Sequence, residues 1–302
     1  MWKPALIVFI TVLLTILTAG AGWAYYLYQK AGTHVEEMND NYAEDVGTSI
    51  QSSGPLRGTV SFLFLGIGDR PGEKGLADTI MGASINPEDE SVLLFNIPRD
   101  TKLNIPGRGR EKINHAYAYG GAGLVKQTAE NKLDYSFDFV VEADMQGFSE
   151  IVDQLGGVKV KNDFAFSQDN VDHSRTFHFK KGPVTLNGEE ALQYVRMRKS
   201  DPRGDLGRNE RQRQVLSALL EDTMSLGHLP DSSDILDIME NNVKTNMTLE
   251  ELRALFTRYR SSFDYIQTFE LEGKNQMDKG VSYYEVTTRE WQKAALRLKN
   301  HH

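Results

Sequence analysis

Residues 59–72 read TVSFLFLGIGDRPG, and this segment predicts a buried β-strand that runs directly into a glycine-rich turn. Two more apolar runs follow at residues 80–85 and 91–97, with the turn sequence NPED after the first and Pro98 as the stop of the second. Because apolar residues fill these runs with little polar alternation, we expect strands that are covered on both faces. The segment therefore predicts the centre of a β-sheet.

Helices and strands are mixed in the rest of the chain. The predicted elements are a helix at 120–131, a strand at 137–142, a helix at 145–155, a short strand at 158–160, a polar insertion without clear period at 164–181, and two helices that begin with capping boxes, at Asn187 with Glu190 and at Thr248 with Glu251. This order predicts an α/β (α+β) fold, a three-layer α-β-α body with a central mixed sheet.

The N-terminal region is almost free of charge from residue 4 to residue 28. About 20 apolar residues with a rise of ~1.5 Å each cross a hydrocarbon core of ~30 Å, so this region predicts a transmembrane helix. The aromatic residues at 23–28 are typical of a membrane interface, and they favour an uncleaved anchor. The small residues at 18–22 leave a cleavable signal peptide as the alternative.

We expect three parts along the chain. They are a cytoplasmic tip with the transmembrane anchor at 1–30, an extracellular linker at 31–57, and one folded domain at 58–302. Positive charges flank the anchor almost equally, but acidic residues crowd positions 36–45 and no second apolar span follows. The predicted topology is a single-pass protein of the cell membrane, with its N-terminus inside and its domain outside. Residues 221–302 match no motif, and we expect them to complete the core.

Composition excludes several kinds of protein. The chain has 302 residues and a formal net charge of −8, which argues against a nucleic-acid partner. It has no cysteine, which excludes a disulfide framework, a thiolate nucleophile and cysteine-ligated zinc. The Walker lysine loop, the Gly-x-Ser-x-Gly elbow and the His-Glu-x-x-His zinc motif do not occur in the sequence. A glycosidase needs two carboxylates at a fixed separation, which the sequence alone does not place.

One segment departs from this acidic balance. Residues 194–214 carry seven cationic and three acidic side chains, about +4 in total. Arginine forks match phosphate oxygens in pairs and stay protonated, so the segment predicts a site for a multiply charged anion, with phosphate as the first candidate. A solvated helix face with surface ion pairs is the alternative. Arg196 and Arg198 alternate along an extended segment, so both are expected to point towards the predicted site. Arg208, Arg211 and Gln212 are three and four positions apart, so they are expected to share one helix face towards it.

Acidic residues lie upstream, in loops next to the predicted strands. Asp69 follows the first strand and Asp78 comes just before the second. Two carboxylates brought together there would hold Mg²⁺, with Mn²⁺ as a substitute, because these ions prefer oxygen ligands. Capping of turns is the alternative role for both aspartates. Arg99 adds a cation at the end of the third strand, where its alternative role is a salt bridge with Asp100 or Glu111.

Six groups of short motifs occur in a fixed order between residues 58 and 220. They are FLGI at 64–67, ADT at 77–79, IPRDT at 97–101, KINHAY at 112–117, GF at 147–148 with LGGV at 155–158, and GEEALQYVRMR at 188–198 with DLGR at 205–208 and RQ at 211–212. In this order the motifs resemble the LytR-CpsA-Psr family of membrane-anchored cell-envelope phosphotransferases, of the wall teichoic acid ligase type.

The resemblance implies a reaction and a set of residue roles. A phosphoglycopolymer such as wall teichoic acid would move from an undecaprenyl pyrophosphate carrier to a peptidoglycan hydroxyl, in an envelope of the Gram-positive type. Asp69 and Asp78 would bind Mg²⁺, with Asp78 also as general base and Arg99 beside it in catalysis. Apolar strands and helices would line a lipid pocket. The pyrophosphate would lie among six cationic side chains and one hydrogen-bond donor: Arg70, Arg99, Arg196, Arg198, Arg208, Arg211 and Gln212.

One position departs from the family pattern. Gly68 stands where members commonly have the first aspartate, and Asp69 follows one position later. We expect that the turn is re-registered so that Asp69 reaches the metal. Two other functions stay open for the same site. One is a non-catalytic, membrane-anchored binder or regulator of lipid-linked polymers, and the other is a lipid pyrophosphatase that uses water as acceptor.

Overall fold

The computed structural model describes residues 42, 46, 56–68, 75–170, 172–225 and 243–301. The predicted anchor at 1–30 lies outside these residues, as do Asp69 and Arg70. In the described part of the chain, no helix is both long enough and apolar enough to cross a membrane.

Three antiparallel strands form the middle of a six-stranded sheet whose order is β11-β6-β1-β2-β3-β12. They are β1 (Val60–Gly68), β2 (Leu76–Asn86) and β3 (Ser91–Asn96). Every residue of β3 is buried, and so are most residues of the other two. The apolar runs predicted this, since a strand covered on both faces has no polar side to present.

The outer strands make the sheet mixed. β6 (Phe139–Asp144) pairs parallel with β1, and β12 (Ile266–Glu270) pairs parallel with β3. β11 (Val243–Thr245) closes the other edge antiparallel to β6. The predicted mixed sheet is therefore confirmed, and the unassigned C-terminal region supplies both of its edge strands, β11 and β12.

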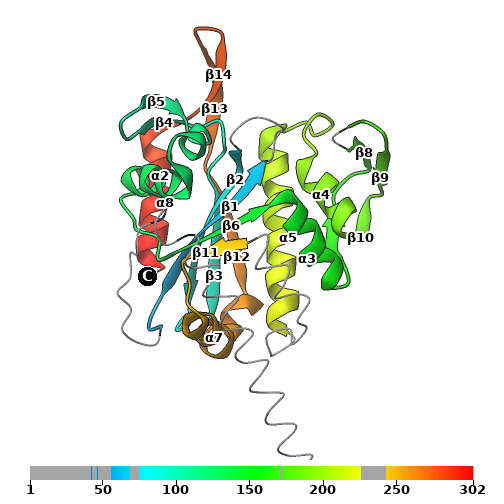
Figure 1. The fold of residues 1–302 in the computed structure, drawn as a ribbon, viewed down its shortest axis with the longest axis horizontal. Coiled ribbons are helices and arrows are strands. Elements are labelled where there is room, and N and C mark those ends of the chain that lie inside the picture. The colour runs from blue at the N-terminus through cyan, green and yellow to red at the C-terminus, as the bar shows by residue number, and fades with distance from the viewer. Residues whose placement is uncertain are drawn as a thin grey trace, which may run out of the picture.

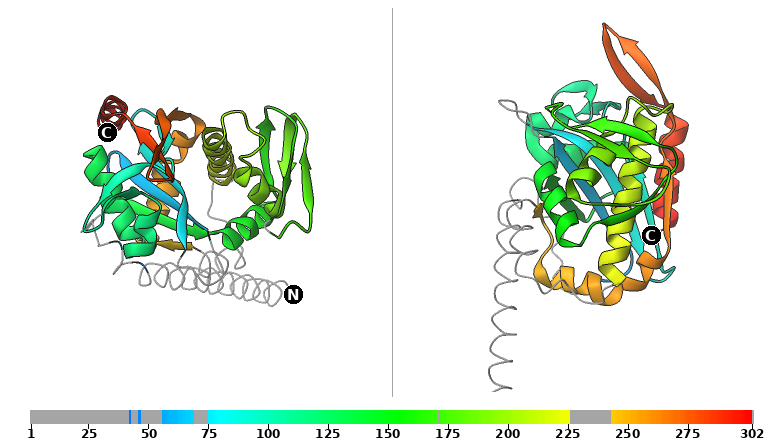
Figure 2. Two further views of the ribbon diagram at one scale, coloured as in Figure 1. Left: turned by 90° about the horizontal axis from the view of Figure 1, so that it is seen from above. Right: turned by 90° about the vertical axis from the view of Figure 1, so that its right-hand side faces the viewer.

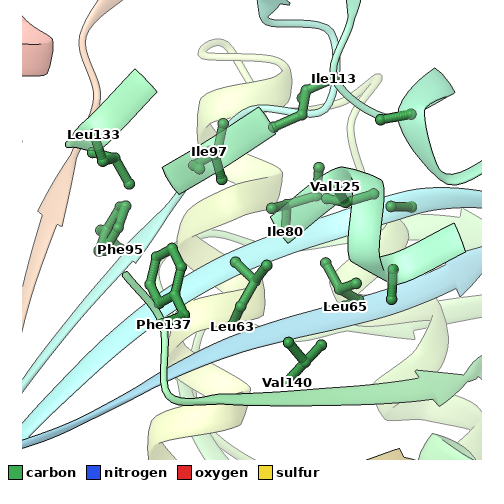
Figure 3. Close-up of a cluster of buried hydrophobic side chains, with 14 of the residues drawn as sticks. Leu63, Leu65, Ile80, Phe95, Ile97, Ile113, Val125, Leu133, Phe137 and Val140 are labelled. Atoms are coloured by element: carbon green, nitrogen blue, oxygen red, sulfur yellow. The ribbon is translucent and has the colours of Figure 1, made fainter. Parts of the chain in front are cut away.

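Helices cover both faces of this sheet, as Figures 1 and 2 show. On one face lie α2 (His115–Leu133) and α8 (Thr288–Asn300), packed over a core that includes Leu63, Leu65, Ile80 and Phe95 (Figure 3). On the other face, α5 (Asp205–Ser225) and α7 (Leu249–Arg258) pack on a second core that includes Phe62, Leu94 and Phe139. The three layers that the sequence predicted are present.

A third core lies beside the sheet and holds the polar insertion of the sequence. It is enclosed by α3 (Met145–Gln154), β7 (Val158–Asn162), β8 (Phe166–Asp169), β9 (Thr176–Phe179), β10 (Gly182–Leu186) and α4 (Gly188–Arg196). The insertion shows no clear period in the sequence, and in the structure it forms the β8–β9 hairpin. Phe166 and Phe179 are cross-strand partners whose rings pack with that of Tyr194, and this burial outweighs the polar residues between them.

Two further hairpins and one short helix complete the fold. β4 (Lys102–Ile105) pairs with β5 (Gly109–Lys112), and β13 (Gly273–Asp278) pairs with β14 (Val281–Val286). The β13–β14 hairpin projects from the top of the domain in Figure 1. A 3₁₀ helix, η1 (Arg260–Asp264), precedes β12. Residues 243–301 therefore complete the core, as expected, and also add a projecting hairpin.

The helix starts follow the sequence signals. Asn187 Oδ1 accepts a hydrogen bond from the Glu190 N–H (2.9 Å), and Glu190 Oε2 accepts one from the Asn187 N–H (3.0 Å), which is the predicted capping box of α4. Thr248 and Glu251 cap α7 in the same way. The helix expected at 120–131 begins earlier, because α2 carries an extra turn before a break at Gly120 and Gly121.

Both ends of the described chain are tied to the domain. Tyr42 is 1% exposed and donates a hydrogen bond to Glu142 Oε2 (2.7 Å), although it falls in the segment predicted as a linker. His301 contacts the hydroxyls of Ser84 (2.9 Å) and Ser91 (3.0 Å) through its two ring nitrogens. These contacts join the chain ends to the sheet and its edge loops.

Candidate active site

A cavity of about 1550 Å³ lies between the sheet and the helices α3, α4 and α5. Strand register sets the character of its floor. Val141, Phe64 and Met81 are neighbours across β6, β1 and β2, and all three line the cavity. Towards the end of β1 the floor changes to small side chains and then to Gly68 beside Asp78. The cavity is therefore apolar along the middle of the sheet and charged at the strand ends.

Asp78 and Arg99 meet at this charged end. Arg99 Nη1 donates to Asp78 Oδ1 at 2.5 Å, and both side chains are 20% exposed. Two contacts fix the loop that carries Arg99. The Arg99 carbonyl accepts a hydrogen bond from the Asn114 N–H (3.2 Å), and Lys112 Nζ forms an ion pair with the neighbouring Asp100 carboxylate (2.8 Å). Arg99 is thus placed by residues of the predicted KINHAY motif.

Burial acts to lower the pKa of Arg99, but the carboxylates of Asp78, Asp100 and Asp205 outweigh it and raise the pKa above its ordinary value. The pKa of Arg208 behaves in the opposite way. Burial lowers it to about 10, and the nearby Arg99 acts in the same direction against the attraction of Asp205. Arg208 remains protonated at neutral pH, yet it lies in a place where its charge is incompletely compensated.

Asp205 joins the arginines of the two helices that border the site. It is the first residue of α5, and its carboxylate lies 3.0 Å from Arg198 Nε and 2.8 Å from Arg208 Nη2. Arg196 also lines the cavity; burial lowers its pKa, and the charge of Asp78 opposes that shift. Sequence reasoning placed these three arginines correctly in one region but gave no role to Asp205.

The cluster holds more positive than negative charge. Four guanidinium groups, those of Arg99, Arg196, Arg198 and Arg208, line the cavity. Three carboxylates form ion pairs with them, those of Asp78, Asp100 and Asp205, and Asp100 is shared with Lys112. Arg99 Nε and Arg208 Nε are buried and have no hydrogen-bond partner among the described residues. Buried donors are normally satisfied, so the arrangement suits an anion that carries at least two charges.

Gln212 and Arg211 follow each other on α5 but face different surroundings. Gln212 lines the cavity, and its side-chain oxygen accepts from Asn96 Nδ2 (3.4 Å), which leaves its amide nitrogen to donate. Arg211 does not line the cavity. Its guanidinium donates to Asp201 Oδ2 (2.6 Å) and to the Met197 carbonyl (2.5 Å), so it holds the loop between α4 and α5.

The Asp201 carboxylate depends on a glycine for its place. Its side chain is fully buried, and a Cβ added at Gly207 would overlap it, so only glycine lets α5 approach this closely. The sequence left open that Asp201 is a surface partner of the arginines. The structure instead makes it an internal support for Arg211, and we leave Arg211 out of the set that would contact an anion.

Comparison with known proteins places this geometry in a family. The family described as LytR_cpsA_psr matches residues 25–300. This chain belongs to the LytR-CpsA-Psr family. The match extends beyond the motifs seen in the sequence and takes in the region after residue 220, which carried no recognisable signal.

Relatives within the LytR-CpsA-Psr family are similar over nearly the whole chain. The polyisoprenyl-teichoic acid–peptidoglycan teichoic acid transferase TagU of Bacillus subtilis (strain 168) is 38% identical over 289 residues, which is 94% of this chain and 91% of that protein. The protein of the same name from Oceanobacillus iheyensis is 36% identical over 300 residues, 96% of this chain and 92% of that protein. These names confirm the predicted transferase class.

Solved structures of the LytR-CpsA-Psr proteins share the fold. The crystal structure of B. subtilis TagU has a TM-score of 0.64 at 37% identity, covering 81% of this chain and 97% of that one. A structure of TagT bound to LIIa-WTA has a TM-score of 0.70 at 32% identity, covering 85% and 96%. The mixed α+β architecture derived from the sequence is therefore that of the LytR-CpsA-Psr fold.

The departure from the LytR-CpsA-Psr pattern at Gly68 has a local reason. A Cβ at this position would overlap Asp78 Oδ2, so the bare glycine makes room for the Asp78 carboxylate at the end of β1. Asp69 and Arg70 follow immediately, but both lie outside the described residues. The expected re-registration of the turn therefore stays a prediction.

The described residues fit a divalent ion only in part. Asp78 offers one carboxylate, of which Oδ1 is bonded to Arg99 and Oδ2 lies against Gly68. No group of three or more His, Cys, Asp or Glu side chains within the described ranges is arranged to hold a metal ion. Mg²⁺ commonly takes one or two carboxylates together with substrate phosphates and waters, so Asp78 with a bound diphosphate is compatible with it.

Proposed function

We propose that this protein transfers an anionic glycopolymer, such as wall teichoic acid, from an undecaprenyl pyrophosphate carrier to a hydroxyl of peptidoglycan. The observation that carries the proposal is a single cavity in which excess positive charge adjoins an apolar floor. A lipid-linked diphosphate has the same two parts, a compact multiple anion and a long hydrocarbon chain. The names of the relatives support the polymer and the acceptor.

The diphosphate would occupy the charged end, where Arg99, Arg196, Arg198 and Arg208 surround a space that their own carboxylates do not neutralise. Gln212, one helical turn after Arg208 on α5, would donate a hydrogen bond to the diphosphate. The isoprenoid chain would lie along the apolar row of the sheet. Exclusion of water by the lipid would strengthen each charge interaction at the reacting phosphorus.

In the proposed reaction, the acceptor hydroxyl oxygen bonds to the phosphorus that carries the polymer, and the bridging P–O bond of the diphosphate breaks. A phosphodiester forms, and lipid monophosphate leaves with the electron pair of the broken bond. The hydroxyl proton passes to the Asp78 carboxylate. Positioning and charge stabilisation supply most of the rate in phosphoryl transfer, so fixed arginines suit this role better than a covalent nucleophile would.

Mg²⁺, or Mn²⁺ in its place, would be held by Asp78 and Asp69 together with the phosphate oxygens. When bound, such an ion neutralises charge on the phosphate oxygens and orients them. Arg99 keeps the Asp78 carboxylate in position for this through its bond to Oδ1. We also propose that residues 1–30 anchor the protein in the cell membrane with the domain outside, which is where a lipid-linked donor and peptidoglycan meet.

The test is reconstitution of the full chain in detergent micelles with a lipid-pyrophosphate oligosaccharide, Mg²⁺ and peptidoglycan fragments. Oligosaccharide covalently joined to the glycan supports the transferase. Free phosphorylated oligosaccharide, produced with or without acceptor, makes the protein a lipid pyrophosphatase. A donor that binds but stays intact in the presence of acceptor and metal makes it a binder or regulator.

A further inference from the structure

The β13–β14 hairpin has two chemically different faces. Residues directly opposite each other in an antiparallel pair share one face, and the register pairs Asn275 with Tyr284 and Met277 with Ser282. Gly273, Asn275, Ser282 and Tyr284 all line the large cavity. This face, which we call the cavity face of the hairpin, carries no charged side chain between Gly273 and Val286.

The opposite face is charged and holds the hairpin in place. Asp278 accepts from Lys102 Nζ at 2.6 Å, and Glu285 lies 3.4 Å from Arg110. Tyr283 donates to Glu111 (3.3 Å), and the Lys102 ammonium lies 4.5 Å from the centre of its ring. The hairpin is thus attached to the β4–β5 hairpin, and its cavity face is presented in a fixed orientation.

The cavity face adjoins the charged end of the site. The Tyr284 N–H donates to the Asp100 carbonyl at 2.8 Å, and Tyr284 forms a parallel bridge with Thr101. Asp100 follows Arg99, whose guanidinium holds Asp78. A molecule that rests on Asn275 and Ser282 therefore lies beside the group that would bind the diphosphate.

We propose that the cavity face of the β13–β14 hairpin is the acceptor subsite, and that it binds a neutral stretch of glycan strand so that a sugar hydroxyl points towards Asp78 and Arg99. The proposal rests on the proposed transferase function. An amide and a hydroxyl donate and accept hydrogen bonds from sugar hydroxyls, while Met277, which is 65% exposed, offers an apolar surface to the C–H side of a sugar ring.

The absence of charge on this face distinguishes acceptor from donor. A polyanionic donor polymer is best bound by lysine and arginine, which gather on the other side of the cavity at Arg196, Arg198 and Lys199. A glycan strand whose hydroxyls are its main polar groups needs no such countercharge. The two substrates would therefore meet from opposite sides of the mouth, with the reacting phosphorus between them.

The experiment compares the double variant Asn275→Ala/Ser282→Ala with Gln276→Ala in the full chain. Gln276 is also an exposed amide, one residue away and on the other face of the hairpin, so it is a matched control. We expect the double variant to raise the KM for a soluble peptidoglycan oligosaccharide about 3- to 10-fold for each hydrogen bond lost. The Kd for the lipid-linked donor should be unchanged, and Gln276→Ala should match the wild type in both.

Other results would overturn the proposal. A rise in donor Kd with an unchanged acceptor KM would assign the face to the donor polymer, and equal parameters in all three proteins would remove any role in binding. Direct titration of the peptide-free oligosaccharide separates this proposal from the function itself. If the wild type transfers nothing but binds the oligosaccharide, and the double variant binds it more weakly, the subsite stands while the transferase function fails.

Discussion

Arg208 and Arg211 lie one helical turn apart on α5, but their guanidinium groups bind different carboxylates in different surroundings. Arg208 reaches Asp205 at 2.8 Å in the wall of the cavity, whereas Arg211 reaches the fully buried Asp201 at 2.6 Å beneath the loop between α4 and α5. One side chain is available to a ligand and the other is part of the framework. The two arginines therefore allow binding and folding to be separated by substitution.

We expect Arg211→Gln to lower the free energy of unfolding by about 3–5 kcal/mol, because the fully buried Asp201 carboxylate loses its close guanidinium partner and keeps the Arg203 guanidinium at 3.7 Å. Arg208→Gln should change stability by less than about 1 kcal/mol, since burial and Arg99 already disfavour its charge and Asp205 keeps Arg198. The same variant should weaken donor binding. Denaturant unfolding and donor titration measure the two effects, and equal losses of stability would contradict this division.

Asp78→Asn should lower kcat by about 10²- to 10³-fold, the range seen when one preorganised group is removed from a reacting centre. Donor affinity should persist, because asparagine retains an oxygen that can accept from Arg99. Single-turnover kinetics with a labelled donor provide the measurement. Asp169→Asn is the control, since Asp169 also lines the cavity but lies on the β8–β9 hairpin and has a half-exposed side chain. A normal kcat for Asp78→Asn would exclude Asp78 from the chemistry.

Removal of divalent ions should depress turnover more than donor binding. Chelation is expected to reduce kcat, and added Mg²⁺ or Mn²⁺ should restore it, because the ion would neutralise phosphate oxygens in the transition state. In Asp78→Asn the metal concentration for half-maximal recovery should rise several-fold, since one of two proposed carboxylate ligands is lost. Full activity in chelator would rule out the metal, whatever the effect of Asp78→Asn.

Tyr42→Phe tests the attachment of the N-terminal region. Glu142 is buried and accepts hydrogen bonds from Tyr42 (2.7 Å) and Tyr117 (2.8 Å). Loss of one hydrogen bond to a charged group costs about 1.5–3 kcal/mol, so Tyr42→Phe should lower the free energy of unfolding by that amount. Tyr265→Phe, at a tyrosine that is 59% exposed, should have almost no effect. Equal free energies of unfolding in urea for Tyr42→Phe and Tyr265→Phe would refute the attachment.

Acid should destabilise the domain partly through His301. Burial lowers the pKa of His301, with Asp89 acting weakly in the opposite direction. The unfolded chain therefore binds more protons than the folded one as the pH falls through about 6.5, and stability decreases with falling pH in that window. His301→Asn should flatten the decline of Tm between pH ~7.5 and ~5.5 around this value. A decline of Tm in His301→Asn as steep as that of the wild type would contradict this role.

Much of the central sheet could be predicted because its signals are local. The apolar runs at β1, β2 and β3 and the capping boxes at Asn187 and Thr248 each specify one element without reference to distant residues. The parallel pairing of β3 with β12 joins residues far apart in sequence, and no local pattern announces it. The β13–β14 hairpin was missed for a related reason, since β13 is mostly exposed and polar.

The sequence predicted which residues belong to the candidate site more accurately than it predicted where their side chains lie. Charge density in residues 194–214 identified Arg196, Arg198 and Arg208, which do line one cavity with Asp78 and Arg99. Helical spacing alone did not separate Arg208 from Arg211, because positions three and four residues apart spread over a wide arc of the helix. The loop that carries Asp201 determines which arginine turns inward, and that information is tertiary.

The burial of Tyr42 fixes where the N-terminal region joins the domain, and with the proposed anchor it would limit how far the domain can lie from the membrane. If residues 4–28 cross the membrane, only residues 29–41 separate the bilayer surface from the domain. That short tether reaches at most ~50 Å even when fully extended, and ~20 Å as a helix. An enzyme on such a tether would serve only acceptors within that distance of the bilayer.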